Sequence, residues 1–115
     1  MSGLTGLPNF PGIAELLKRA REMGAQLKET RERLRNERYS ASVGGDLVKV
    51  TVNGECDVLQ VEIDPSLVDS SGKEMLEDLV AAAVNQAAKK AREASREAMA
   101  KVTGGVDVSG LLGLS

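Results

Sequence analysis

Apolar residues in the first third of the chain recur at steps of three and four, which is the period of one helix face. They are Ile13, Leu16, Leu17, Ala20, Met23, Leu27 and Leu34. Opposite charges stand four positions apart on other faces, as in Glu15 and Arg19, and each such pair stabilises a helix slightly. The pattern predicts an amphipathic helix over about residues 12–36, with a narrow apolar stripe like that of coiled coils.

Beyond this helix the apolar residues alternate with polar ones, which favours β-strands. A short, weakly patterned strand is expected over residues 38–43, and two glycines and an aspartate at 44–46 mark a turn. The firmest strand is expected over residues 47–52, with its three valines on one face. These segments predict two neighbouring strands of one sheet.

The dipeptide Asn53-Gly54 predicts a two-residue hairpin, because both residues tolerate positive φ. A third strand is expected from about Glu55 to Ile63, and Asp64-Pro65 ends it, since proline cannot donate to a strand ladder. The side chains expected to face inward from it are Leu59, Val61 and Ile63. The pairing register stays open, with a bulge beside Glu55 as one alternative.

A second long helix is indicated from about residue 73 to Val102, ended by Thr103 and two glycines. Ser71 and Glu74 fit a capping box at its start. Its apolar stripe is aliphatic at first and mostly alanine later. The order of elements is therefore α-β-β-β-α, an α+β chain with a three-stranded antiparallel sheet and two long helices.

The chain has 115 residues, which argues for a single domain. We expect a flexible leader over residues 1–11, a folded domain over 12–105 and a flexible tail over 106–115. Cys56 is the only cysteine, so no intramolecular disulfide is possible and a cytoplasmic location is favoured. Neither a secretion signal nor a membrane-spanning run is apparent, which predicts no membrane association.

Charge is distributed unevenly along the chain, although the net charge is only −2. Residues 13–38 carry eight basic and five acidic side chains, and residues 89–101 carry five basic and two acidic. Residues 46–78, in contrast, carry two basic and nine acidic side chains. The two helical flanks are thus basic and the middle of the chain is acidic.

The lengths of the expected elements favour a homodimer. A helix of about 30 residues spans about 45 Å, whereas a strand of about seven residues spans only about 23 Å. The helices should therefore project past the sheet with apolar stripes that need burial, and a second copy is the simplest supplier. The exposed edges of a three-stranded sheet also favour a second copy, because proteins usually cover or pair such edges. The alternative is a monomer whose two helices pack on each other.

Several segments resemble the YbaB/EbfC family of bacterial nucleoid-associated proteins. They are LVKVTVNG at 47–54, VEIDPSL at 61–67 and KEMLEDLVAAAVNQAAKK at 73–90. The resemblance covers about residues 12–105 and implies a tweezer-like homodimer with helical arms. It also implies binding of double-stranded DNA and a role in nucleoid organisation or gene regulation, without catalytic residues.

Basic residues on the two helices are the candidate DNA contacts, because lysine and arginine contacts to phosphate supply most of the non-specific affinity for DNA. The candidates are Arg31, Arg33, Arg35, Arg38, Lys89, Lys90, Arg92 and Arg96. The alternative is an ordinary solvated helix face whose glutamates balance these charges. A second functional hypothesis is a protein-interaction adaptor that uses the alanine-rich helix and the tail.

Other chemistry finds little support in the sequence. There is no histidine to activate Ser66 as a nucleophile. The spacing of the acidic residues fits no EF-hand loop, and the glycine pairs form no phosphate-binding loop. Cys56 and Tyr39 are interpreted as packing residues. We therefore expect no enzyme activity, no metal or other cofactor and no small-molecule substrate.

Overall fold

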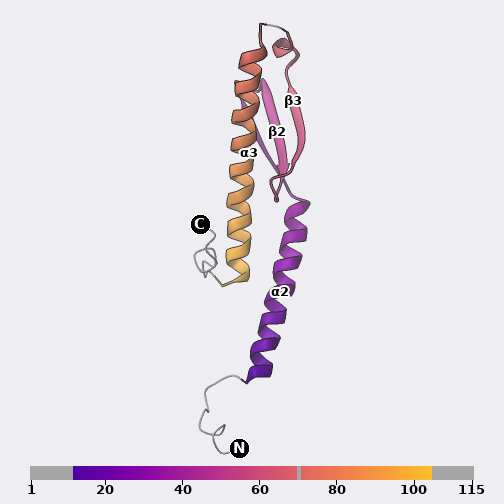
Figure 1. The fold of residues 1–115 in the computed structure, drawn as a ribbon, viewed down its shortest axis with the longest axis vertical. Helices are drawn as coiled ribbons and strands as arrows, with labels where there is room; N and C mark the ends of the chain where they lie inside the picture. Colours follow the sequence, from indigo (N-terminus) through magenta and orange to yellow (C-terminus); the bar gives the residue numbers. More distant parts are fainter. Residues whose placement is uncertain (1–11, 70, 105–115) are drawn as a thin grey trace, which may run out of the picture.

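The structure, a computed structural model, describes residues 12–69 and 71–104 (Figure 1). Its elements in chain order are α2 (Ile13–Arg35), β1 (Arg38–Val43), β2 (Val48–Asn53), β3 (Val58–Ile63), the 3₁₀ helix η1 (Pro65–Leu67) and α3 (Lys73–Val102). The predicted α-β-β-β-α order is confirmed, and both helices agree with their predicted bounds within about one residue. The predicted leader and tail lie outside the described residues.

The three strands form one antiparallel sheet in the order β1-β2-β3. In β1 and β2 the pairing runs without interruption, with Ala41 opposite Val50. Between β2 and β3 the register shifts, because Thr51 pairs with Gln60 whereas Val52 pairs with Val58. The extra residue at this bulge is on β3, several positions away from Glu55, where the sequence had suggested it.

The predicted two-residue hairpin at Asn53-Gly54 is wrong, and β3 begins at Val58 rather than at Glu55. Residues 54–57 form a longer loop, which the Asn53 side chain organises. Its Oδ1 atom accepts hydrogen bonds from the backbone N–H groups of Glu55 (2.9 Å) and Asp57 (3.0 Å). The positive φ of 67° falls on Cys56, not on the glycine.

The core lies between the sheet and one face of α3. Val48, Val50 and Val52 of β2 are fully buried, and the helix presents alanines to them. These are Ala83, Ala87 and Ala91, all fully buried. Because alanine has no side chain beyond Cβ, α3 lies close to the strands. Each buried valine contributes roughly 1.5–3 kcal/mol through the burial of apolar surface.

The apolar side chains of β3 stay partly exposed, although Val61 and Ile63 have the inward orientation that the sequence predicts. Val61 is opposite Val50 and Ile63 is opposite Val48, so both lie on the same face of the sheet as the core. However, α3 lies over β1 and β2, and it leaves this edge of the sheet uncovered (Figure 1). As a result Val61 is 42% exposed and Ile63 is 38% exposed.

The second helix begins differently from the predicted capping box. Its N-cap residue is Gly72, and no side chain caps it. The hydroxyl of Ser71 donates instead to Oδ1 of Asp69 (2.7 Å), which also accepts from the backbone N–H of Gly72 (2.8 Å). Asp69 therefore organises this turn in place of Ser71 and Glu74.

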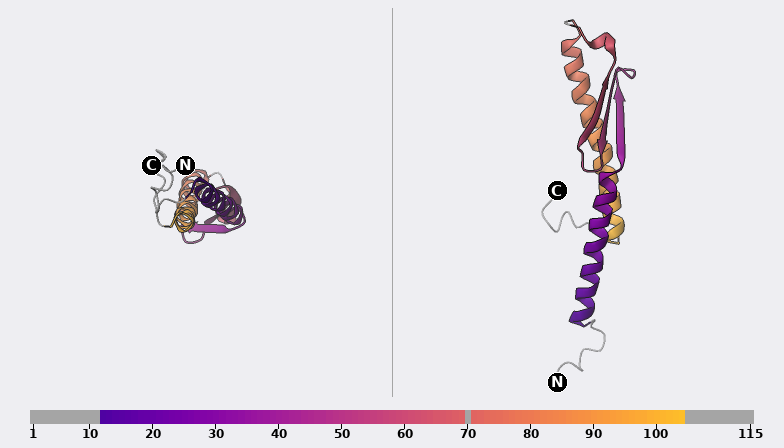
Figure 2. Two further views of the ribbon diagram at one scale, coloured as in Figure 1. Left: turned by 90° about the horizontal axis from the view of Figure 1, so that it is seen from below. Right: turned by 90° about the vertical axis from the view of Figure 1, so that its right-hand side faces the viewer.

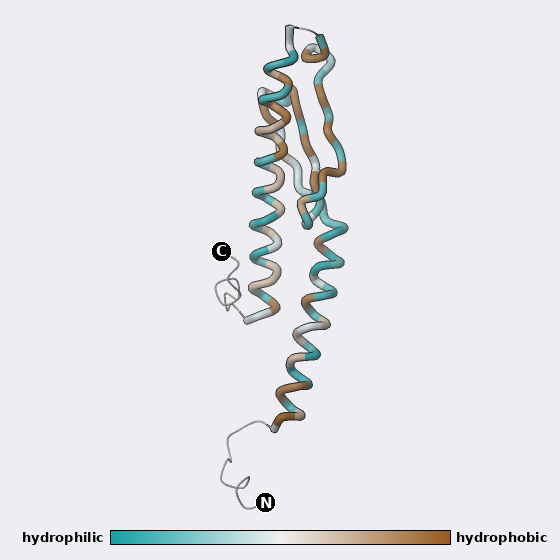
Figure 3. Tube along the Cα trace, viewed as in Figure 1, coloured by the Kyte–Doolittle hydropathy of each residue, from teal (hydrophilic) through white to brown (hydrophobic). Residues whose placement is uncertain are grey.

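α2 extends far beyond the sheet and beyond the end of α3 (Figures 1 and 2). Its buried residues are Thr30 and Leu34, close to its C-terminal end. Residues 13–26, here called the distal segment, stay exposed, and the apolar end of this segment is visible in Figure 3. The radius of gyration is 22.2 Å, against about 13 Å for a compact domain of 100 residues. One chain alone therefore does not form a compact body.

Candidate nucleic-acid interface

The four basic candidates around the end of α2 differ in what they contact. Arg33 forms an ion pair with Glu37 (3.6 Å), and Arg35 forms one with Glu55 (3.1 Å). The side chains of Arg31 and Arg38 are exposed and make no ion pair within residues 12–69 and 71–104. Of these four residues, Arg31 and Arg38 therefore have the positive charge that is most available to a ligand.

The four candidates on α3 also fall into two groups. Lys90 donates from Nζ to the backbone carbonyl oxygen of Ser40 in β1 (2.7 Å), so its ammonium group is held against the sheet. Lys89, Arg92 and Arg96 are exposed, and in the described part of the chain their side chains have no ion-pair partner. Their spacing of three and four places them on one face of the helix.

The structure does not gather the eight candidates into one cluster. Three of them lie at the C-terminal end of α2, Arg38 is the first residue of β1 rather than part of the helix, and the other four lie on α3. Arg96 is six residues beyond Lys90, which is about 9 Å along the helix axis. The basic surface is therefore extended rather than pocket-like, which suits a long polyanion better than a small ligand.

Glutamates shift the pKa values of two side chains near the end of α2. The pKa of Arg35 is raised, first by its hydrogen bonds to Glu55 and then by the charge of that carboxylate. The hydroxyl of Tyr39 donates to Oε2 of Glu37 (2.6 Å), which raises the pKa of Tyr39 to about 12. The ring of Tyr39 packs against the core, as expected for a packing residue.

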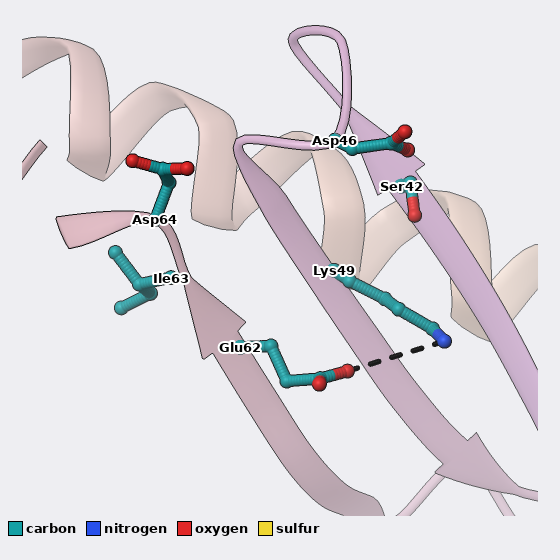
Figure 4. Close-up of a pocket in the computed structure, with 6 residues that line it drawn as sticks. All are labelled: Ser42, Asp46, Lys49, Glu62, Ile63 and Asp64. Carbon is teal, nitrogen blue, oxygen red and sulfur yellow. Dashed lines mark ion pairs between the residues drawn. The ribbon is translucent and has the colours of Figure 1, made fainter. Parts of the chain in front are cut away.

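Acidic residues surround a hollow at the other end of the sheet (Figure 4). Its lining includes Asp46, Glu62 and Asp64, and Glu62 forms a long ion pair with Lys49 (4.0 Å). Among the described residues no group of three or more acidic, cysteine or histidine side chains is arranged to hold a metal ion. Asp64 instead accepts from the backbone N–H of Ser66 (2.9 Å), which fits the predicted structural role at the end of the strand.

Sequence reasoning missed the partners that hold Arg35 and Lys90. Glu55 lies 20 residues from Arg35, and Ser40 lies 50 residues from Lys90. No periodicity links positions so far apart, because these contacts depend on how α3 packs on the sheet and on how the end of α2 meets the loop of residues 54–57. The acceptor for Lys90 is moreover a backbone carbonyl, which every residue carries.

The sequence profile of the YbaB/EbfC DNA-binding family matches residues 10–106. The chain belongs to this family. A match of this extent includes both helices and all three strands, so the basic surfaces of α2 and α3 lie within the family's shared region. Within residues 12–69 and 71–104 there is no helix with an apolar stretch long enough to cross a bilayer.

Curated relatives of this chain are named nucleoid-associated proteins. A nucleoid-associated protein of Anaeromyxobacter sp. (strain Fw109-5) is 45% identical over 101 residues, covering 88% of this chain and 98% of that protein. One from Thermoanaerobacter sp. (strain X514) is 42% identical over 106 residues, covering 92% and 96%. The fold also matches the crystal structure of an uncharacterized protein from Helicobacter pylori, with a TM-score of 0.70 and 22% identity over 76% of this chain and 92% of that chain.

Proposed function

We propose that this protein binds double-stranded DNA as a homodimer, mainly through phosphate contacts from its basic helical surfaces. The role we assign to it is nucleoid organisation or gene regulation in the cytoplasm. The observation that carries the proposal is a set of exposed basic side chains without ion-pair partners in the described part of a YbaB/EbfC chain. They are Arg31, Arg38, Lys89, Arg92 and Arg96.

The separation of charge explains how a chain with a net charge of −2 can bind a polyanion. Phosphate contacts depend on local charge, because each lysine or arginine that neutralises a phosphate releases condensed counterions. The acidic residues Asp46, Glu62 and Asp64 lie together at the far end of the sheet. Repulsion from them favours DNA on the helical surfaces that carry Arg92 and Arg96.

The exposed surface of β3 supports the dimer. Val58, Leu59, Val61 and Ile63 are each between 38% and 48% exposed on a strand at the edge of the sheet. Edge strands with apolar side chains pair or aggregate unless something covers them. The opposite edge is β1, where Lys90 already donates a hydrogen bond to the backbone carbonyl oxygen of Ser40. A second copy placed against β3 would cover the apolar surface that α3 leaves open.

A duplex-binding curve measured at several salt concentrations tests the DNA part of the proposal. The logarithm of the binding constant should fall linearly with the logarithm of salt concentration, with a slope of about −0.9 per phosphate contact. Arg92→Gln should flatten this slope by about 0.9 per subunit. The control is Lys73→Gln at the exposed start of α3, beyond the sheet, which should leave the slope unchanged. Binding that does not depend on salt would contradict phosphate contacts.

Light scattering of Val61→Lys tests the dimer. A charge at this position should prevent burial of the β3 surface and give a monomer. The matched control is Val68→Lys, because Val68 is also exposed (67%) but follows η1 rather than lying on β3. If Val61→Lys has the same mass as the unmodified protein, β3 is not the interface.

A further inference from the structure

The C-terminal end of α2 is bound to the loop of residues 54–57. The carbonyl oxygen of Leu34 accepts a hydrogen bond from the backbone N–H of Gly54 (2.8 Å) and another from that of Glu37 (3.1 Å). A Cβ atom at Gly54 would collide with this carbonyl oxygen and would lie 2.7 Å from Cβ of Leu34. The glycine is therefore required for close approach between loop and helix, a use that differs from the turn role its sequence context suggests.

An ion pair reinforces the same junction. Arg35 donates to Oε1 of Glu55 from Nε (3.3 Å) and from Nη2 (3.1 Å). Two donors on one acceptor restrict the orientation of the guanidinium group more than a single contact would. The loop is itself held by the hydrogen bonds that Asn53 accepts, so the helix is attached to a rigid part of the body.

Apart from this junction, α2 also contacts α3, and this contact does not extend over the whole helix. Its buried residues are Thr30 and Leu34, and the distal segment, residues 13–26, is exposed throughout. A helix of 23 residues is about 34 Å long, so a rotation of about 10° at the junction moves its far end by about 6 Å. Small changes at the loop are thus amplified along α2.

We propose that the 54–57 loop fixes the direction of α2, and that Gly54, Arg35 and Glu55 are positioning residues that set the spacing between the two α2 helices of the dimer. Arg35 then acts on DNA binding through the helix it orients and does not contact phosphate. The consequence for DNA rests on the proposed function, whereas the attachment of the helix does not.

Distances between two spin labels test the attachment without DNA. In a Cys56→Ser background, labels at Gln26 and Glu77, both exposed, report the position of α2 relative to α3. Dilution with unlabelled protein isolates the distance within one chain. We expect one narrow distance distribution in the parent protein, a broader one in Arg35→Gln and in Glu55→Gln, and a shifted mean in Gly54→Ala.

The exchanged pair R35E/E55R provides the decisive variant, because it keeps the composition and reverses the ion pair. It should restore the narrow distribution. Both partners are partly exposed, so these variants should fold. A distribution in Arg35→Gln as narrow as that of the parent protein would overturn the proposal.

Measurements of DNA binding distinguish a positioning role of Arg35 from a direct contact between Arg35 and phosphate. Arg35→Gln should weaken binding roughly threefold or more at every salt concentration, because only some orientations of a loose helix are competent to bind. The slope against salt should stay unchanged. Arg31→Gln is the matched control on the same helix and should flatten the slope by about 0.9 per subunit. A flatter slope in Arg35→Gln would identify Arg35 as a phosphate contact and overturn its positioning role.

Discussion

The ammonium group of Lys90 on α3 lies 2.7 Å from the backbone carbonyl oxygen of Ser40 on β1. A side chain from the helix thereby satisfies an acceptor on an edge strand, where unpaired backbone groups are open to another strand. The neighbouring Lys89 is exposed and has no ion-pair partner within the described residues. Two adjacent lysines thus differ in their contacts, and we predict different roles for them.

Replacing each lysine by methionine should separate these roles. Lys89→Met should flatten the salt dependence of DNA binding by about 0.9 per subunit, because it removes one of the proposed phosphate contacts. Lys90→Met should leave that slope unchanged but expose the edge of β1, so sedimentation should show species larger than those of the unmodified protein. Equal flattening in both variants would mean that Lys90 leaves Ser40 to bind phosphate.

The close approach of α3 to the sheet makes the alanine positions sensitive to size. Ala87 is fully buried against the strands, whereas Ala81 on the same helix is exposed. Ala87→Leu should reduce the free energy of unfolding by about 1–3 kcal/mol, because added methylenes force the helix off the sheet. Ala81→Leu is the control and should have little effect. Urea denaturation followed by circular dichroism measures both, and equal stabilities would argue against tight packing at Ala87.

Periodic features of this chain were predictable from sequence, and features that depend on tertiary contact were not. The stripe from Ile13 to Leu34 has the period of a helix face and the valines of β2 have the period of a strand face, and both elements form where these periods predict them. The two-residue hairpin was predicted from the tolerance of Gly54 for positive φ. In the structure a glycine is required there because the backbone approaches Leu34 closely. The same loop pairs Arg35 with Glu55. A count of basic residues in the sequence therefore overstated how many arginine and lysine side chains are free to bind a ligand.

The exposure of the apolar side chains of β3 was not predictable for a related reason. Val61 has the alternation of an inward-facing residue and does lie on the core face, but no described helix covers it. A sequence pattern shows which face of a strand is apolar, but not which chain covers that face. The exposure of Val61 is therefore an observation that favours the proposed second copy.

A residue with higher helix propensity in the distal segment should stabilise α2 locally. Gly24 lies in its interior, and a Cβ atom there would meet nothing within 4 Å. Gly24→Ala should stabilise the helix locally by about 1 kcal/mol, because alanine loses less backbone entropy than glycine. Since this segment contacts little of the body, slower amide hydrogen exchange should be confined to α2. Slower exchange throughout the chain would show that the segment is packed in the native assembly.

Acid should weaken the turn that precedes α3. The pKa of Asp69 is held below its ordinary value of 3.8, chiefly by the hydrogen bond from Ser71 and then by that from Gly72. The pKa of Asp64 is likewise lowered, mainly by Ser66. When a carboxylate has a lower pKa in the folded state, the unfolded chain binds more protons as pH falls. The stabilisation is therefore present above pH 3.8 and is lost as the pH drops through the folded value.

Asp69→Asn tests this linkage, because it removes the titrating group while keeping an oxygen that can accept the same hydrogen bonds. The free energy of unfolding, measured by urea denaturation between about pH 5 and pH 2, should fall less steeply in this variant than in the parent protein. If Asp69→Asn and the parent lose stability in parallel, the hydrogen bonds from Ser71 and Gly72 do not favour the ionised carboxylate, and Asp69 does not hold the start of α3 through its charge.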